Sequence, residues 1–167
     1  TVIGQRAVRV AGLYLPNGNP WPGPKFDYKL AWMQRLHDHA QSLLATEMPV
    51  LMMGDYNVIP ESRDAARPEK WTSDALFQPE SRAAFRRILN QGWTEAVRMR
   101  DPDGNCGPFT FWDYQAGAWQ KDDGIRIDHV LMSPQAADLL IDLGIDRDER
   151  AKDKPSDHVP VWVDLDA

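Results

Sequence analysis

The sequence has little cysteine, no long apolar run and no excess of positive charge. Its single cysteine, Cys106, cannot form an internal disulfide and lacks metal-type spacing, so we expect a reducing compartment, the cytoplasm. No apolar run approaches the roughly 20 residues that cross a bilayer, and residues 1–6 lack the apolar core of a signal peptide. A membrane protein is therefore not expected.

The formal net charge is −6 at pH 7. This charge argues against a protein that holds nucleic acid by bulk electrostatics, because phosphate binding normally requires a basic face. It is compatible with carboxylates that gather around a divalent cation. A local nucleic-acid site therefore stays open.

The length and composition predict one compact domain over residues 1–167. A chain of 167 residues with 43% apolar content can bury a core and is not disordered. Neither an internal repeat nor a low-complexity tract interrupts it.

The first half of the chain predicts a strand, a helix and a second strand. Residues 7–14 alternate and are rich in valine, which is typical of a strand. Apolar residues recur at three- and four-residue steps over 26–44, which predicts a long amphipathic helix. Residues 50–53 are apolar throughout, as in a strand covered on both faces.

The second half predicts further helices and strands, and with them a mixed α/β (α+β) fold. Residues 60–80 have the composition of a surface loop before a short helix at 82–90. Residues 109–112 and 125–132 have strand composition, and we expect them to pair. A helix at 134–143 and strands at 144–148 and 159–165 complete the prediction.

Asp55 and Asn57 follow the buried strand. If the chain stays extended over these positions, both side chains project to one side. Asp55 then serves as a general base or metal ligand, and Asn57 offers a neutral donor to a developing oxyanion. The alternative is an Asx turn, which satisfies the same side chains through backbone hydrogen bonds.

Asp128 lies within an otherwise strand-like run. A carboxylate that enters a core needs a partner, because its desolvation costs several kcal/mol without one. Arg126, on the same face of an extended strand, is one candidate for a plain salt bridge. A histidine from elsewhere in the chain, held in one tautomer by the carboxylate, is the other.

The segment Ser156-Asp157-His158 supplies such a histidine at the entrance to the last strand. Its acid and imidazole are compatible with metal or phosphate chemistry, and a capping turn is the alternative. Two carboxylates about 4 Å apart repel by roughly 4 kcal/mol at an effective dielectric of 20. A site that gathers Asp55, Asp128 and Asp157 would therefore need a cation or a protonated histidine.

Five motifs resemble, in order, those of exonuclease III and related apurinic/apyrimidinic endonucleases, and together they span nearly the whole chain. They are Tyr14 before Pro16-Asn17-Gly18, Gly54-Asp55-Tyr56-Asn57, Phe109-Thr110-Phe111-Trp112-Asp113-Tyr114, Gly124-Ile125-Arg126-Ile127-Asp128-His129 and Lys154-Pro155-Ser156-Asp157-His158. The resemblance implies part of the four-layer α-β-β-α sandwich of the endonuclease/exonuclease/phosphatase superfamily. It also implies a DNA-repair phosphodiesterase.

The resemblance further implies roles for individual residues. Asp55 would activate the attacking water, and Asn57 would orient it and hold the phosphate. Asp128 would orient His158, whose protonated ring would bind a phosphoryl oxygen. Tyr14 would contact the phosphate or leaving group. Mg²⁺ (or Mn²⁺) would be held by Asp157, Asp55 and Asn57.

The implied substrate is double-stranded DNA with abasic sites or 3′ ends. The aromatic segment with Phe111 and Trp112, together with Ile125 and Ile127, corresponds to an apolar pocket for a flipped-out baseless sugar. Ordinary sheet packing explains these side chains equally well. Trp119 and Lys121 lie in a loop that the resemblance places near the DNA.

The sequence departs from the family at its start. The family begins with an active-site asparagine and a glutamate that is the principal metal ligand, and neither segment occurs here. We therefore expect an N-terminally truncated domain that binds metal weakly and catalyses poorly. Other superfamily activities, such as an inositol phosphatase or sphingomyelinase, and a non-catalytic binding domain remain as alternatives; no stable protein partner is implied.

Overall fold

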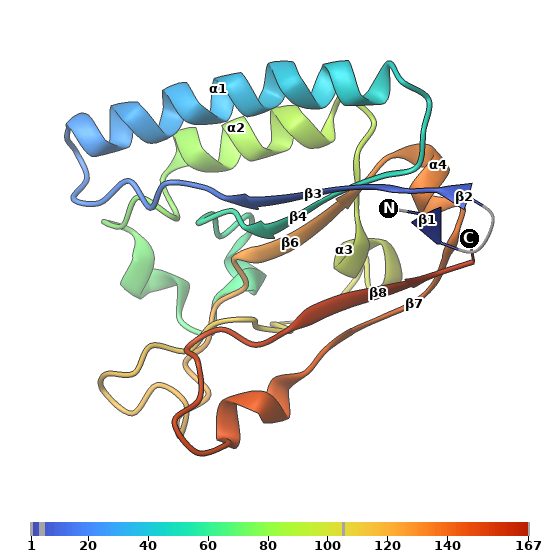
Figure 1. Cartoon of the computed structure of the whole chain (residues 1–167). Helices are drawn as coiled ribbons and strands as arrows, with labels where there is room; N and C mark the ends of the chain where they lie inside the picture. Colours follow the sequence, from blue (N-terminus) through green and yellow to red (C-terminus); the bar gives the residue numbers. More distant parts are fainter. Residues whose placement is uncertain (1, 4–5, 105, 167) are drawn as a thin grey trace.

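The computed structural model describes residues 2–3, 6–104 and 106–166, which form a mixed α/β fold (Figure 1). A four-stranded sheet with the order β3-β4-β6-β5 occupies the middle of the fold. β3 and β4 run parallel, whereas β6 is antiparallel to both β4 and β5. The bounds are β3 (Arg9–Tyr14), β4 (Val50–Asp55), β5 (Thr94–Glu95) and β6 (Asp128–Met132); a short antiparallel pair, β1 (Val2–Ile3) and β2 (Arg6–Ala7), precedes them.

Two helices, α1 (Pro24–Leu44) and α2 (Pro79–Leu89), cover one face of this sheet (Figure 1). Both begin at a proline, whose fixed φ and missing N–H suit the first helical turn. The predicted apolar stripe of α1 is buried, with Met33, Leu36 and Ala40 packed against Met52 of the sheet. The periodicity at 26–44 and the short helix near 82–90 are thus confirmed.

The opposite face of the sheet packs against an antiparallel hairpin, β7 (Leu140–Ile145) and β8 (Val161–Leu165). Leu51 and Val130 contribute to this second core from the sheet, and Leu143 and Val163 from the hairpin. The described elements therefore form three layers in the order helices, sheet and hairpin (Figure 1).

Several expectations for the second half are wrong. The strand expected at 144–148 continues only to Ile145, because residues 147–151 form a 3₁₀ turn, and the surface loop expected at 60–80 buries Asp64, Ala65, Ala75 and Leu76. The helix that begins at Pro134 is only α4 (Pro134–Ala137), and residues 140–143 belong to β7, because pairing with β8 outweighs their local helical preference. Residues 109–112 form no strand; Phe111 makes single bridges to Ile125 and His158. β6 begins at Asp128 rather than at residue 125.

The remaining connections are short helices and turns. α3 (Ala96–Arg100) follows β5, and three 3₁₀ turns lie at η1 (Ser62–Asp64), η2 (Pro68–Trp71) and η3 (Arg147–Ala151). An apolar cluster that includes Ile59, Leu76 and Ile127 fixes η2 beside the sheet edge. Among the described residues, no helix is long and apolar enough to span a bilayer.

Candidate phosphoesterase site

Tyr14, Asp55 and Asp128 lie in one row across three neighbouring strands. Tyr14 is paired with Asp55 in the parallel β3–β4 register, and Asp55 with Asp128 in the antiparallel β4–β6 register. The last residues of β3 and β4 and the first residue of β6 therefore meet at the same edge of the sheet. Sequence spacing alone could not establish this convergence.

His158 completes the row from the loop that precedes β8. Its Nδ1 lies 2.8 Å from Oδ2 of Asp128. Phe111 bridges to the His158 backbone, and the two rings meet edge to face with centroids 5.0 Å apart. Of the two partners considered for Asp128, the histidine is thus the one that the structure shows.

Charge favours the protonated form of His158. Burial disfavours the imidazolium, but the hydrogen bond and charge of Asp128, with the charges of Asp55 and Asp157, raise the pKa of His158 above its ordinary value. Within the described residues, Nε2 of His158 has no hydrogen-bond partner. This ring edge can donate to an anion.

Asp55 and Asn57 are joined by the Asx-type turn. The Asn57 backbone N–H donates to Oδ1 of Asp55 at 2.7 Å, and its side-chain amide donates to Oδ2 at 3.0 Å. The chain does not stay extended, because Asn57 has a φ of 48°. The expectation that an extended chain projects both side chains to one side is therefore wrong, although both side chains line the same cavity.

Asp55 is a carboxylate short of compensating charge. Burial, reinforced by the charge of Asp128, raises the pKa of Asp55 to about 6, although the Asn57 backbone hydrogen bond opposes this rise. Such a pKa suits a general base that works near neutral pH.

The cavity at this sheet edge has a volume of about 340 Å³. It brings together most of the residues predicted from the sequence: Tyr14, Asp55, Asn57, Phe111, Ile125, Ile127, Asp157 and His158. Tyr14 is 72% exposed, so its ring stands at the mouth. The cavity is also lined by Asn17 and Asp113, which belong to the quoted motifs but had no predicted role, and by Trp71, Asp74 and Leu76, which the sequence did not single out.

Four other predicted residues do not line this cavity: Trp112, Trp119, Lys121 and Asp128, of which Asp128 is linked to it through the hydrogen bond to His158. Trp112 is buried, donates from Nε1 to Asp122 and packs edge to face against Trp119. Lys121 is exposed and donates to the carbonyl of Ala116. Within the described arrangement, Trp112 and Trp119 stabilise the loop of residues 115–124 rather than line the cavity.

Lys29 is an unpredicted support beneath the site. Its side chain is fully buried, and Nζ donates to the backbone carbonyls of Asn17, at 3.0 Å, and Asn57, at 2.5 Å. Burial lowers the pKa of Lys29 to about 7 against the pull of Asp74 and Asp55. A signal existed in the sequence, because Lys29 interrupts the apolar stripe three residues after Phe26.

The residues present fit a cation that takes few protein ligands. Among the described residues, no group of three or more His, Cys, Asp or Glu side chains is placed to hold a metal. Mg²⁺ is usually bound through one or two carboxylates together with water and substrate phosphate. Asp55 and Asp157 line the same cavity and supply two such carboxylates.

Arg126 belongs to a separate, buried ion cluster, so the alternative of a plain Arg126–Asp128 salt bridge is excluded. Its guanidinium lies 2.9 Å from Asp64 and 2.8 Å from Glu95. Arg98 also pairs with Asp64, and Nη1 of Arg126 lies 3.0 Å from Nδ1 of His129. Residues 126 and 127 precede β6, so the alternation of side chains along a strand does not place Arg126 on the same face as Asp128. Arg126 does not line the cavity.

Comparison with known proteins places the chain among nucleases and phosphatases. It matches the Endonuclease/Exonuclease/phosphatase family over residues 2–158. Exodeoxyribonuclease III of Haemophilus influenzae is 33% identical over 147 residues, which cover 84% of this chain and 55% of that protein. An exodeoxyribonuclease of Bacillus subtilis is 31% identical over 154 residues, 92% of this chain and 58% of the relative.

Solved structures show the same fold. An AP endonuclease from Archaeoglobus fulgidus superposes with a TM-score of 0.89 at 32% identity, over 96% of this chain and 62% of that one. The 3′ phosphatase NExo from Neisseria, bound to a product DNA hairpin, superposes with a TM-score of 0.89 at 34% identity and the same coverage. The chain spans little more than half of the two curated relatives, and it belongs to the Endonuclease/Exonuclease/phosphatase family.

Proposed function

We propose that this chain carries the reaction site of a Mg²⁺- (or Mn²⁺-) dependent DNA-repair phosphodiesterase, which hydrolyses DNA at abasic sites and 3′ ends. The observation that carries the proposal is the Asp128–His158 pair, at 2.8 Å, beside a cavity that Asp55 and Asn57 also line. A general base and a cationic donor that share one cavity suit the in-line displacement of a phosphodiester.

In the proposed reaction, Asp55 accepts a proton from the attacking water. Its pKa of about 6 leaves it largely ionised at neutral pH yet basic enough to take a proton. Asn57 uses both amide hydrogens on Asp55 and the carbonyl of Leu15, so we assign it to orienting Asp55 rather than to holding phosphate.

His158 binds a phosphoryl oxygen through the Nε2 edge of its protonated ring. Asp128 fixes the ring through Nδ1 and favours the imidazolium. Tyr14 contacts the phosphate or leaving group from the cavity mouth. Asp55 and Asp157 would hold Mg²⁺, which when bound offsets the negative charge that develops at phosphorus.

The proposal of DNA as the substrate rests on the relatives and on the cavity walls. Similar proteins carry the names exodeoxyribonuclease III and DNA repair nuclease, and one structural neighbour is bound to a product DNA hairpin. Phe111, Ile125 and Ile127 form an apolar wall that suits a baseless sugar.

The NExo structure favours a second candidate activity, the removal of a terminal 3′ phosphate. That reaction needs the same base and the same cationic donor, because water attacks phosphorus and the 3′ oxygen leaves in both cases, and only the remaining substituent on phosphorus differs. We therefore expect both activities to depend on the same residues.

The test compares labelled DNA duplexes that contain one abasic analogue, a recessed 3′ end or a 3′ phosphate, with and without Mg²⁺. Asp55→Ala should lower the Mg²⁺-dependent rate by about 10²–10⁴-fold, the range for loss of a general acid or base, and His158→Ala by about 10²–10³-fold, the range for loss of a donor to a developing oxyanion. Asp142→Asn, an exposed acid on β7, is the control and should leave the rate unchanged. Retained activity in both alanine variants would refute the assigned residues, and faster turnover of an inositol phosphate or phospholipid would refute DNA.

A further inference from the structure

A second cavity, which we call the Trp71 cavity, adjoins the candidate site. It is lined by Lys70, Trp71, Asp74, Phe111, Asp113, Gln115, Ala116, Ala118 and Asp123, and has a volume of about 290 Å³. Trp71, Asp74, Phe111 and Asp113 line both cavities. A ligand held at the candidate site can therefore extend past Phe111 into the Trp71 cavity without crossing the protein core.

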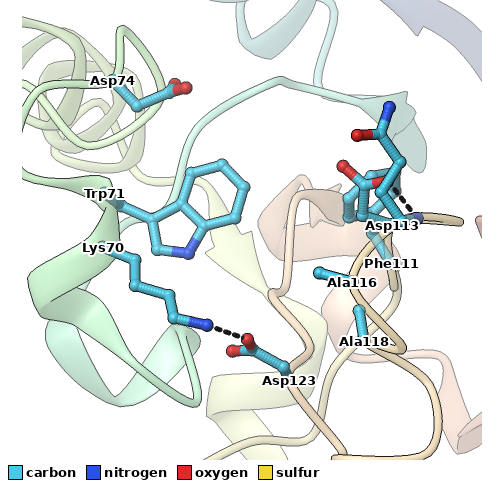
Figure 2. A pocket seen from close by; sticks show the side chains of 9 residues that line it. Lys70, Trp71, Asp74, Phe111, Asp113, Ala116, Ala118 and Asp123 are labelled. Carbon is cyan, nitrogen blue, oxygen red and sulfur yellow. Dashed lines mark hydrogen bonds and ion pairs between the residues drawn. The ribbon is translucent and has the colours of Figure 1, made fainter.

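Trp71 is a rigid aromatic wall in this space. It ends η2, is partly buried and packs against the apolar cluster that contains Leu76 and Ile125. Figure 2 shows the ring projecting toward Phe111, Ala116 and Ala118 on the opposite loop. Because packing already restricts the indole, little rotamer entropy is lost when a planar group stacks on it.

Salt bridges link η2 to the opposite wall of the Trp71 cavity. Lys70 pairs with Asp123, and Nε of Arg67 lies 3.7 Å from the same carboxylate, so η2 is tied to the loop of residues 115–124 (Figure 2). The backbone N–H of Gln115 donates to Oδ1 of Asp113 at 2.7 Å. Across the described residues, the Gln115 side-chain amide and Oδ2 of Asp113 make no hydrogen bond, so both can pair with a ligand.

Among its lining residues, the Trp71 cavity offers a phosphate no unpaired cation, whereas the candidate site offers His158, so the Trp71 cavity favours an uncharged heterocycle. Asp74, Asp113 and Asp123 outnumber Lys70, and that lysine is already paired. A cavity of about 290 Å³ lies just below the range of about 300–1,000 Å³ for complete small-molecule sites, so it suits one moiety of a larger ligand. An aromatic wall, small alanines and free amide and carboxylate groups match a nucleobase.

We propose that the Trp71 cavity binds the base of a nucleotide that adjoins the reacting phosphate, with that base stacked on Trp71. The proposal rests on the proposed function and adds a base-binding subsite to it. Stacking provides affinity for any base, because every base has a π-face. Asp113 favours bases with an exocyclic amino group, since its free oxygen can only accept a hydrogen bond.

The experiment compares two probes that differ only in the base, deoxyadenosine 5′-monophosphate and deoxyribose 5-phosphate. Binding is followed by NMR at the Gln115 side-chain amide of the full chain, without any cleavage. Trp71→Ala should weaken binding of the nucleotide by about 5- to 150-fold, the equivalent of about 1–3 kcal/mol per stacked base. It should change binding of the sugar phosphate less than about twofold. Trp71→Phe, which keeps a ring, should show an intermediate loss.

Trp162→Ala is the matched control, because Trp162 lies on β8 and is 39% exposed outside both cavities. It should leave both affinities unchanged. Equal losses for the two probes in Trp71→Ala, or no loss in either, would overturn the subsite. Because neither probe is cleaved, a base-dependent loss would support the subsite even if DNA hydrolysis fails, whereas hydrolysis without that loss would overturn the subsite alone.

Discussion

Two groups of charged side chains meet at the segment of residues 126–129 and differ in how their charge is balanced. In the buried cluster, Asp64 and Glu95 face Arg98 and Arg126, so the acids and guanidinium groups match in number. At the candidate site, Asp55, Asp128 and Asp157 share His158 as their nearby cation. Although Arg126 and Asp128 are two positions apart in the chain, the side chain of Arg126 lies in the charge-balanced cluster and that of Asp128 lies at the site with an excess of carboxylates.

This difference separates a structural role from a chemical one. A buried carboxylate with matched partners is already satisfied, and removing a partner costs folding free energy. A carboxylate whose pKa is raised at the wall of a cavity is poised to gain a cation or a proton, which is typical of functional sites. The predictions below test this contrast, beginning with the largest expected effect.

Breaking the Asp128–His158 pair should remove activity with little loss of fold. Asp128→Asn should lower kcat for DNA hydrolysis by about 10²–10³-fold, because the His158 ring loses both its orientation and its charge as a donor to the phosphoryl oxygen. The double variant Asp128→Asn, His158→Ala should be no slower than the worse single variant, since the two side chains act as a unit. The rates of the three variants measure this coupling. A loss in the double variant equal to the product of the two single losses would contradict it.

Breaking the buried cluster should have the reverse effect. Arg126→Met leaves Asp64 and Glu95 without their shared cation, so the free energy of unfolding should fall by about 3–5 kcal/mol. Lys152→Met removes an exposed pair with Glu149 and should cost less than about 1 kcal/mol. Urea titrations of both variants provide the measurement. A loss for Arg126→Met no larger than that of the exposed control would show that the cluster does not stabilise the fold.

Acid should weaken the buried cluster through Glu95. Burial alone would raise its pKa, but the charge of Arg126 and contacts from His129 and Arg98 lower the pKa of Glu95 to about 2, from 4.5 in the unfolded chain. The contribution of Glu95 to stability is therefore complete above about pH 4.5 and is lost as the pH falls toward about 2. Thermal unfolding across this range should show the loss, and Glu95→Gln should flatten it. An unchanged slope in Glu95→Gln would assign the acid sensitivity to other carboxylates.

The smallest effect should be a shift in the titration of Asp55. Without metal, NMR of the side-chain carboxyl carbon should give Asp55 a pKa of about 6. Added Mg²⁺ should lower that pKa, since a nearby cation favours the ionised form. Glu149, a partly exposed acid on η3 that pairs with Lys152, is the control and should not respond. If Mg²⁺ leaves the pKa of Asp55 unchanged, Asp55 is not one of the metal ligands.

Local patterns predicted the elements that present the site. The apolar spacing at 26–44 and the fully apolar run at 50–53 each describe a buried face, and both became the expected helix and strand. Residues 140–143 were assigned to a helix because their strand pairing with residues 163–165 is a tertiary contact that leaves little local trace.

The convergence of the site could not be predicted from spacing. Asp128 and His158 are 30 positions apart, and only resemblance to a family joined them before the structure did. The structure also reassigned Arg126, because its partners Asp64 and Glu95 lie 62 and 31 positions away in unremarkable sequence. Trp71 was missed because the cavity that it lines is formed by segments distant in the chain. Lys29 left a local signal in the apolar stripe, but that signal could not identify its partners, Asn17 and Asn57.

The row of Tyr14, Asp55 and Asp128 makes the chemistry depend on strand alignment. Side chains alternate between the two faces of a sheet, so a slip of one residue in β4 or β6 would turn one carboxylate toward the helices or the hairpin. A chain that is compact but misaligned would thus have normal secondary structure and no site. Turnover per molecule would then report how much of a preparation has reached the correct register, which a spectrum of helix and strand content cannot do.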